Sequence, residues 1–139
     1  MTNPKYPLFI VSKGRAETRH TARYLDYMKV PYRLVVEPSE YDLYLSHVKD
    51  KNKLIELDMS YKDKYDTCDD LGLTKSTGPG PARNFVWDLS IKEGYDFHWV
   101  MDDNIRSFRR YNLNEKVKVS SGTIFSAMEE FVQRYENVG

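Results

Sequence analysis

The chain has 139 residues, enough to bury one hydrophobic core but few for two, so we predict a single domain spanning residues 1–139. Acidic and basic residues number 21 each, which excludes a protein attracted as a whole to nucleic acid or to an anionic membrane. One cysteine, Cys68, excludes an intrachain disulfide framework, and no apolar run reaches the roughly 20 residues of a membrane span, so we expect a cytoplasmic protein.

Short apolar runs and amphipathic stretches alternate along the first half of the chain. The first apolar run predicts a buried strand that ends in the polar, glycine-bearing loop Ser12 to Arg15. Pro31 ends the first helix because proline cannot continue the hydrogen-bond ladder, and Ser39 is expected to cap the second. The predicted elements are a strand at 7–11, a helix at 17–29, a strand at 32–36, a helix at 40–48 and a strand at 53–57.

The second half opens with a polar stretch, residues 58–80, that has several glycines and no clear period. We interpret it as a long loop, and a loop of this length in a compact domain usually covers a ligand site. Pro81 suits the first turn of a helix, apolar residues follow at helical spacing, and Gly94 is placed to end it. The remaining predicted elements are a buried strand at 95–101, a further strand at 105–111 and a terminal core helix whose apolar stripe spans 124–135.

This alternation predicts an α/β domain with an open, mainly parallel Rossmann-type sheet flanked by helices. In such a sheet the strand order reverses between the first and fourth strands, and ligands bind beyond the carboxyl ends of the strands at that reversal. Two loops are expected to meet there, Ser12 to Arg15 after the first strand and Asp102 to Asn104 after the fourth. A basic loop would then lie beside a carboxylate pair, which suits a diphosphate and a metal ion.

The triplet Asp102, Asp103 and Asn104 is the candidate metal site. Carboxylate and amide oxygens suit Mg²⁺ or Mn²⁺ when phosphates complete the coordination shell. Because neighbours on extended backbone point in opposite directions, Asp102 and Asn104 can face one site while Asp103 turns toward another. A plain turn is an equally good interpretation of the triplet alone, since Asp and Asn favour strand ends for local hydrogen bonding.

Arg83 lies in the first turn of the helix that begins near Pro81, where free backbone N–H groups and the helix dipole favour an anion. Its guanidinium could add a bidentate phosphate contact, although a solvent-facing arginine is commoner for any single Arg. Lys13 and Gly14 are weaker signals, because one loop glycine is usually turn chemistry.

Three runs of residues together carry a family resemblance: Ser-Lys-Gly-Arg at 12–15, Gly-Pro-Ala-Arg-Asn at 80–84 and Trp-Val-Met-Asp-Asp-Asn at 99–104. In this order they resemble the nucleotide-binding half of GT-A-fold glycosyltransferases, and most closely the TET-associated glycosyltransferases of bacteriophages, over nearly the whole chain. The resemblance implies a metal motif at Asp102 and Asn104, with Asn104 replacing the commoner second Asp and Asp103 a possible substitute ligand. It also implies nucleotide-sugar contacts from Ser12, Lys13, Gly14, Arg15, Glu37, Arg83, Asp102 and Asp103.

The function that this resemblance implies is metal-dependent transfer of a sugar from a nucleotide-diphosphate donor, a UDP-sugar first of all, to an acceptor hydroxyl. The acceptor would be a 5-hydroxymethylpyrimidine in phage DNA, and the location the host cytoplasm. GT-A enzymes usually have more residues on the acceptor side, so we expect a truncated form, and we assign no catalytic base. Two alternatives stay open: a nucleotidyltransferase, which would prefer a nucleoside triphosphate, and a nucleotide-binding module without catalysis.

A basic cluster follows the acidic triplet, with two aromatic residues interleaved among Arg106, Arg109 and Arg110. Such a mixture can meet nucleic-acid phosphates and stack on bases, which fits a DNA acceptor. A solvated strand face is nonetheless the commoner explanation of a cluster of this size.

Three large side chains receive structural interpretations. We expect His98 to be a buried, hydrogen-bonded histidine, and Trp87 and Trp99 to belong to the core, because large aromatic residues dominate burial in small domains.

Overall fold

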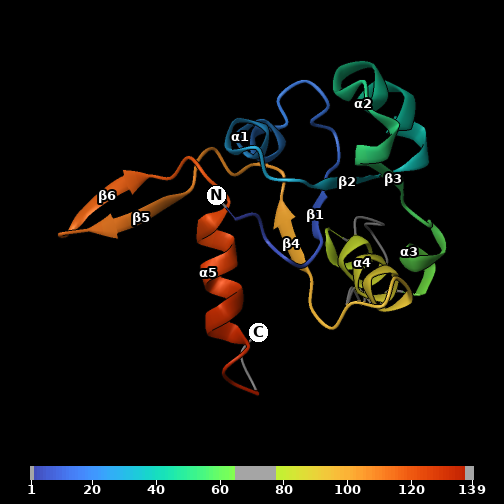
Figure 1. Cartoon of the computed structure of the whole chain (residues 1–139). Helices are drawn as coiled ribbons and strands as arrows, with labels where there is room; N and C mark the ends of the chain where they lie inside the picture. The colour runs from blue at the N-terminus through green and yellow to red at the C-terminus, as the bar shows by residue number, and fades with distance from the viewer. Residues whose placement is uncertain (1, 65–77, 137–139) are drawn as a thin grey trace, which may run out of the picture.

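The computed structural model describes residues 2–64 and 78–136 and confirms an α/β architecture with a parallel sheet flanked by helices (Figure 1). The four sheet strands have the order β3-β2-β1-β4, so the order reverses between β1 and β4 as predicted. These strands are β1 (Leu8–Val11), β2 (Arg33–Val36), β3 (Leu54–Glu56) and β4 (Trp99–Asp102). The helices are α1 (His20–Met28), α2 (Tyr41–Val48), α3 (Ser60–Lys64), α4 (Gly80–Lys92) and α5 (Thr123–Val132), with short 3-10 helices η1 (Pro38–Glu40) and η2 (Lys51–Lys53).

Both faces of the central strand β1 are buried, and each faces a different core. Leu8 and Ile10 belong to the larger core, which takes its helical residues from α1, α2 and α5. Phe9 and Val11 point the other way into a smaller core that includes Val86 of α4. A strand covered on both faces has no polar face, which explains why its sequence is a continuous apolar run.

Helix α1 begins at His20, three residues later than predicted, because Arg19 has left-handed backbone angles (φ 35°, ψ 51°) that no helix can include. It ends at Met28, one residue before the predicted end, with Lys29 as its C-cap. The predicted cap at Ser39 is wrong: Ser39 lies inside η1, and neither η1 nor α2 has a side-chain cap hydrogen bond.

The stretch interpreted as one long loop contains helix α3, so that interpretation is wrong over Ser60–Lys64. Asp58 accepts a hydrogen bond of 3.0 Å from the Ser60 backbone N–H, which is the side-chain signal that opens a helix. The part of the stretch at 65–77, including Cys68, lies outside the described residues. Gly94 (φ 89°) follows the end of α4, as predicted.

The strand predicted at 105–111 is replaced by a later and different element. Residues Arg109–Asn112 form β5, which pairs with an unpredicted strand, β6 (Glu115–Lys118), as an antiparallel hairpin separate from the main sheet. Leu113 and Asn114 form its two-residue turn with φ 50° and 66°, the positive angles of the mirror-image turns that match strand twist. The hairpin projects from the body of the protein (Figure 1).

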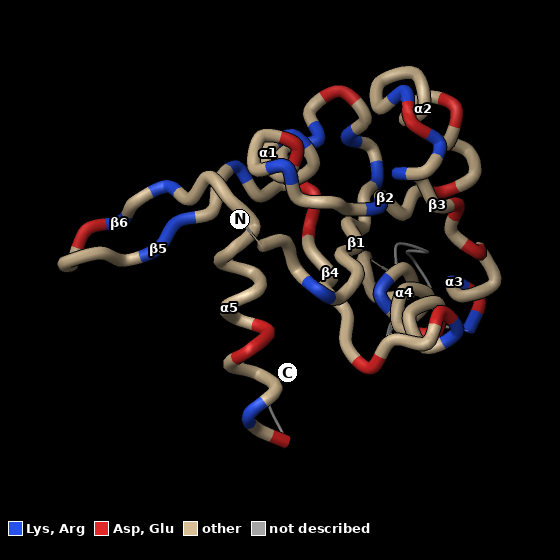
Figure 2. Tube along the Cα trace, viewed as in Figure 1, with Lys and Arg blue, Asp and Glu red and all other residues tan. Residues whose placement is uncertain are grey.

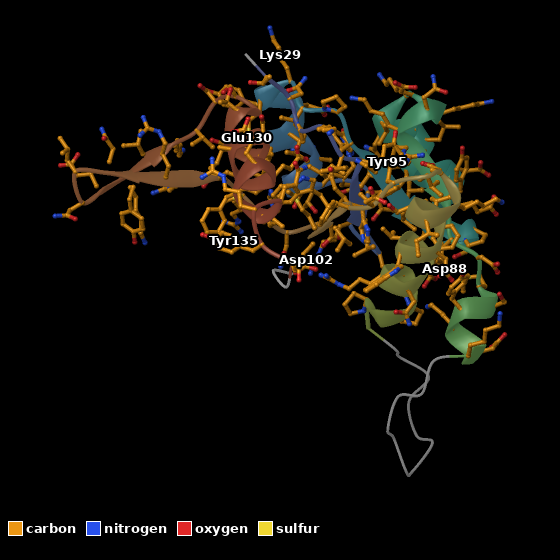
Figure 3. All side chains as sticks on the ribbon, turned by 60° about the horizontal axis from the view of Figure 1, so that its bottom comes forward. Lys29, Asp88, Tyr95, Asp102, Glu130 and Tyr135 are labelled. Atoms are coloured by element: carbon orange, nitrogen blue, oxygen red, sulfur yellow. The ribbon has the colours of Figure 1, made fainter. Side chains whose placement is uncertain are left out.

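Several aromatic residues that we expected in the core are at the surface. Trp87 is 62% exposed, so its assignment to the core is wrong, whereas Trp99 is partly buried and donates a 2.8 Å hydrogen bond to Glu129. In α5 only the first part of the apolar stripe is buried, at Phe125, while Tyr135 lies just beyond the helix and is exposed (Figure 3).

His98 is only half-buried, and its ring makes no hydrogen bond to another described residue. The expectation of a buried, hydrogen-bonded histidine is therefore wrong. It lies between the rings of Phe9 and Trp87, and desolvation lowers its pKa below the ordinary value. Within the described ranges no helix has the length and apolar character needed to cross a membrane.

Candidate functional site

A cavity of about 280 Å³ opens at the carboxyl ends of β1, β2 and β4, where the sheet order reverses. Its walls combine apolar side chains from the strands with charged side chains from the loops that follow them. The start of α4 closes one side. The lining residues are Val11, Ser12, Lys13, Arg15, Val35, Glu37, Leu57, Lys62, Gly78, Pro79, Ala82, Asp102, Asp103 and Asn104.

Asp103 joins the loop after β1 to the turn after β4. Its carboxylate is only 8% exposed, accepts a 2.8 Å hydrogen bond from Ser12 Oγ and forms an ion pair with Arg15. Ser12 Oγ also lies 2.6 Å from the hydroxyl of Tyr44, which accepts a 3.1 Å hydrogen bond from the Arg15 backbone N–H. Burial raises the pKa of Tyr44, so this hydroxyl stays protonated and can donate to Ser12.

Asp102 and Asn104 are exposed on either side of the buried Asp103, as the alternation of extended backbone predicts. The Asp102 carboxylate is 57% exposed at the rim of the cavity, where it accepts a 2.6 Å bond from Arg83 Nη2. Asp102 is therefore available to a ligand that displaces Arg83.

A buried threonine of α1 fixes the backbone of the acidic turn. Thr21 Oγ1 donates a 2.5 Å hydrogen bond to the Asp102 carbonyl and accepts a 2.9 Å bond from the Ile105 N–H. The Thr21 side chain thereby bridges the two ends of the turn and positions the residues between them.

Glu37, directly after β2, is the third carboxylate of the cavity. Burial by itself raises its pKa, but hydrogen bonds from Lys62 and Lys13 outweigh burial and hold the pKa below the ordinary value. The nitrogen of Lys13 lies 3.3 Å from Glu37 Oε1, and this contact raises the pKa of Lys13. Glu37 is thus an ionised acceptor fixed between two ammonium groups.

Comparison with protein families identifies the family of the chain. A family model described as TET-Associated Glycosyltransferase matches residues 6–139 of the chain. The chain belongs to the TET-associated glycosyltransferase family. Searches of curated proteins and of solved structures find no match. The family implies a glycosyltransferase, and among the activities left open by the sequence it favours sugar transfer over nucleotidyl transfer.

Most of the residues predicted to form the site of this glycosyltransferase lie together. Those lining the cavity are Ser12, Lys13, Arg15, Glu37, Asp102, Asp103 and Asn104. Arg83 does not line it but reaches its rim through Asp102. Gly14 lies outside: its φ of 68° forms the turn, and its N–H donates a 2.8 Å bond to Glu40.

Sequence reasoning missed three residues of the site. Lys62 belongs to a helix that was not predicted, although Asp58 gave a capping signal for it. Tyr44 and Thr21 are fully buried, and in the sequence they resemble ordinary core positions of amphipathic helices. No sequence signal reveals that their hydroxyl groups face the site.

The cavity brings cationic side chains, exposed carboxylate and amide oxygens and an apolar wall into one place. Among the described residues, the cations at the site are each paired with a carboxylate: Lys13, Arg15, Lys62 and Arg83. A diphosphate that bound here would therefore exchange for existing ion pairs. The exposed Arg83–Asp102 pair is the easiest to exchange, because ion pairs at the surface contribute little stability.

Proposed function

We propose that this glycosyltransferase binds a nucleotide-diphosphate sugar, with UDP as the first-choice nucleotide, in the cavity at the ends of β1, β2 and β4. Its reaction would transfer the sugar to an acceptor hydroxyl and depend on Mg²⁺ or Mn²⁺. The observation that carries the proposal is the meeting of the basic loop after β1 with the exposed Asp102 in one cavity.

The cavity offers complementary surfaces to the parts of such a donor. Val35, Leu57 and Ala82 provide an apolar wall for the base, and the Glu37 carboxylate beside them can accept hydrogen bonds from ribose hydroxyls or from the base. Arg83 and the N-terminus of α4 favour the diphosphate.

The donor set fits a metal ion that arrives with its nucleotide. Within residues 2–64 and 78–136, no three His, Cys, Asp or Glu side chains group together as a metal site. Mg²⁺ is commonly held by one or two carboxylates together with substrate phosphates, and Asp102 with the Asn104 carbonyl could supply the protein's share. Bound there, the ion would neutralise charge on the diphosphate. Asp103 could approach the ion only by leaving Ser12 and Arg15.

The chain's own contribution to the transfer is to position the donor and to neutralise charge. As the bond between the anomeric carbon and the phosphate oxygen breaks, its electron pair stays with the diphosphate, and Arg83 and Lys13 stabilise the added negative charge. The acceptor oxygen forms the new bond to that carbon and gives up its proton to a base that we do not assign.

The acceptor that we propose is a 5-hydroxymethylpyrimidine in DNA, and the site of action is the host cytoplasm if the chain is phage-encoded. Both rest on the resemblance to bacteriophage members of the family described above.

Calorimetry tests the donor proposal, with UDP, UDP-glucose, GDP-mannose and ATP titrated with and without Mn²⁺. We expect UDP and UDP-glucose to bind more tightly with Mn²⁺, and Asp102→Asn to remove the Mn²⁺ dependence. Asp96→Asn is a matched control, because Asp96 is an exposed aspartate just before β4, at the opposite end of that strand.

The same titrations separate the alternatives. Tight binding of ATP that needs no metal would reject the nucleotide-sugar donor and favour a nucleotidyltransferase. Binding of UDP-glucose without its consumption, in the presence of hydroxymethylated DNA, would favour a module that binds nucleotides without catalysis.

A further inference from the structure

The β5–β6 hairpin carries its positive charge on one face. Residues directly opposite one another in an antiparallel pair share a face, and successive residues of a strand alternate between faces. The register pairs Arg109 with Lys118 and Tyr111 with Lys116. These four residues form what we call the basic face. The opposite face carries Arg110, Asn112, Glu115 and Val117.

The hairpin concentrates charge in a chain that is neutral as a whole. Residues 105–119 contain five cations and one carboxylate, whereas the complete chain has a formal charge of zero. Figure 2 shows the cations on both strands of the projecting hairpin. All the residues of both strands are exposed. Among the described residues, no carboxylate pairs with Arg109, Lys116 or Lys118.

The charge distribution is unfavourable for the hairpin itself. Arg109 and Lys118 lie directly opposite each other, and like charges in that position destabilise a strand pair. A two-stranded ribbon without a core is at best marginally stable, so repulsion between two of its side chains matters for its folding. An external anion between these side chains would remove the repulsion.

The root of the hairpin is firmly attached, so its projecting part is held in one direction. The Val119 N–H donates a 3.0 Å bond to the Phe108 carbonyl, and the Tyr24 hydroxyl donates a 2.8 Å bond to the Val119 carbonyl. The Phe108 ring packs edge-on against Phe125, with centroids 5.1 Å apart. The root also follows the acidic turn closely, since Ile105 is hydrogen-bonded to Thr21.

We propose that the basic face of this hairpin binds duplex DNA and holds it beside the donor cavity. A two-stranded ribbon fits the major groove, and the three cations can contact phosphates while the 72% exposed Tyr111 offers a further hydroxyl donor. Lys116 and Lys118 are two residues apart on one strand, about 7 Å, and so can reach separate phosphates. This inference deepens the proposed function by naming the surface that binds its DNA acceptor.

Fluorescence anisotropy with a labelled 20-base-pair duplex, measured between 50 and 200 mM NaCl, tests the proposal. The variant is the triple substitution Arg109→Gln, Lys116→Gln and Lys118→Gln. Each lost phosphate contact flattens the slope of log K against log[salt] by about 0.9, so we expect a decrease of about 2.7. The corresponding loss of affinity at 0.1 M salt is about tenfold for each contact.

Two controls distinguish a specific effect of the basic face from a general effect of removing positive charge. Arg110→Gln removes the same charge from the opposite face and should weaken binding far less than Arg109→Gln. Lys51→Gln with Lys92→Gln removes exposed charges from η2 and α4, and should leave the salt slope unchanged. Thermal unfolding of the triple variant should show no loss of stability, because the substitutions relieve repulsion.

Wild-type affinity and slope in the triple variant would overturn the proposal, as would equal effects of Arg109→Gln and Arg110→Gln. So would tighter binding of the wild type to phosphatidylserine vesicles than to DNA, because it would point to a membrane surface. This test is independent of the donor site. If the triple variant loses affinity for DNA while the wild type fails to bind UDP with Mn²⁺, the proposed function is rejected but the DNA-binding surface is supported.

Discussion

Replacing Asp103 by alanine removes the carboxylate that holds the loop after β1 to the turn after β4. A buried hydrogen bond to a charged group contributes about 1.5–3 kcal/mol, which applies to the 2.8 Å bond from Ser12. The Arg15 side chain is 47% exposed, so we give its ion pair the surface value of about 0–1 kcal/mol. We therefore expect Asp103→Ala to lower the free energy of unfolding by about 1.5–4 kcal/mol.

Urea unfolding at pH 7 measures this loss of stability. A double-mutant cycle with Ser12→Ala shows how much of it comes from the hydrogen bond between Ser12 and Asp103. The cycle should show a coupling energy of about 1 kcal/mol or more between Ser12 and Asp103, because each is the other's buried partner. Asp96→Ala, at an exposed aspartate, should change stability by less than about 0.5 kcal/mol. A similarly small effect of Asp103→Ala, or additive single variants, would refute the structural role of this network.

Three further predictions concern other parts of the molecule. Arg83→Ala should weaken UDP binding in the presence of Mn²⁺ by about 10- to 100-fold in calorimetry, the value of one charge-assisted bond; unchanged affinity would exclude Arg83 from the diphosphate site. Gly122→Ala should lower the free energy of unfolding by about 1–3 kcal/mol, because a Cβ there would lie 2.9 Å from Cγ2 of the buried Val30 and 3.3 Å from the backbone Cα of Asn3; an unchanged thermal midpoint would contradict this. Because the pKa of Glu37 is lowered from its ordinary 4.5, its stabilising contribution is present above pH 4.5 and is lost as the pH falls through the folded-state pKa. As the pH falls from 5 to 3, the free energy of unfolding of Glu37→Gln, measured by urea titration, should consequently decrease less than that of the wild type. An equal decrease in both proteins would disprove this prediction.

The buried part of the fold could be predicted because burial leaves a periodic pattern in the sequence. The continuous apolar run of β1 and the helical spacing of α1 and α4 both mirror the two cores that they fill. The β5–β6 hairpin has no buried residues in its strands, so its sequence shows no alternation between apolar and polar positions. Its register depends on a two-residue turn that begins with Leu113, an uncommon residue at positive φ.

The location of the site could be predicted from topology, since parallel strands deliver their following loops to one edge of the sheet. The pairings inside the site could not. In the sequence Thr21 lies at helical spacing with the apolar Leu25 and Met28, which is ordinary for a core position, yet its hydroxyl bridges Asp102 and Ile105. Such a role depends on where α1 crosses the end of β4, which is a tertiary property with no local signature.

The bond between Ser12 and Asp103 joins groups that are 91 residues apart in the chain. Pairing segments so distant closes a long loop, which costs entropy before any contact forms and slows folding. During synthesis, β1 to β3 can leave the ribosome well before β4 exists to complete the cavity. A nascent or partly folded chain therefore lacks the cavity that we propose for the donor, so nucleotide binding, if the proposal holds, would report that β4 has docked.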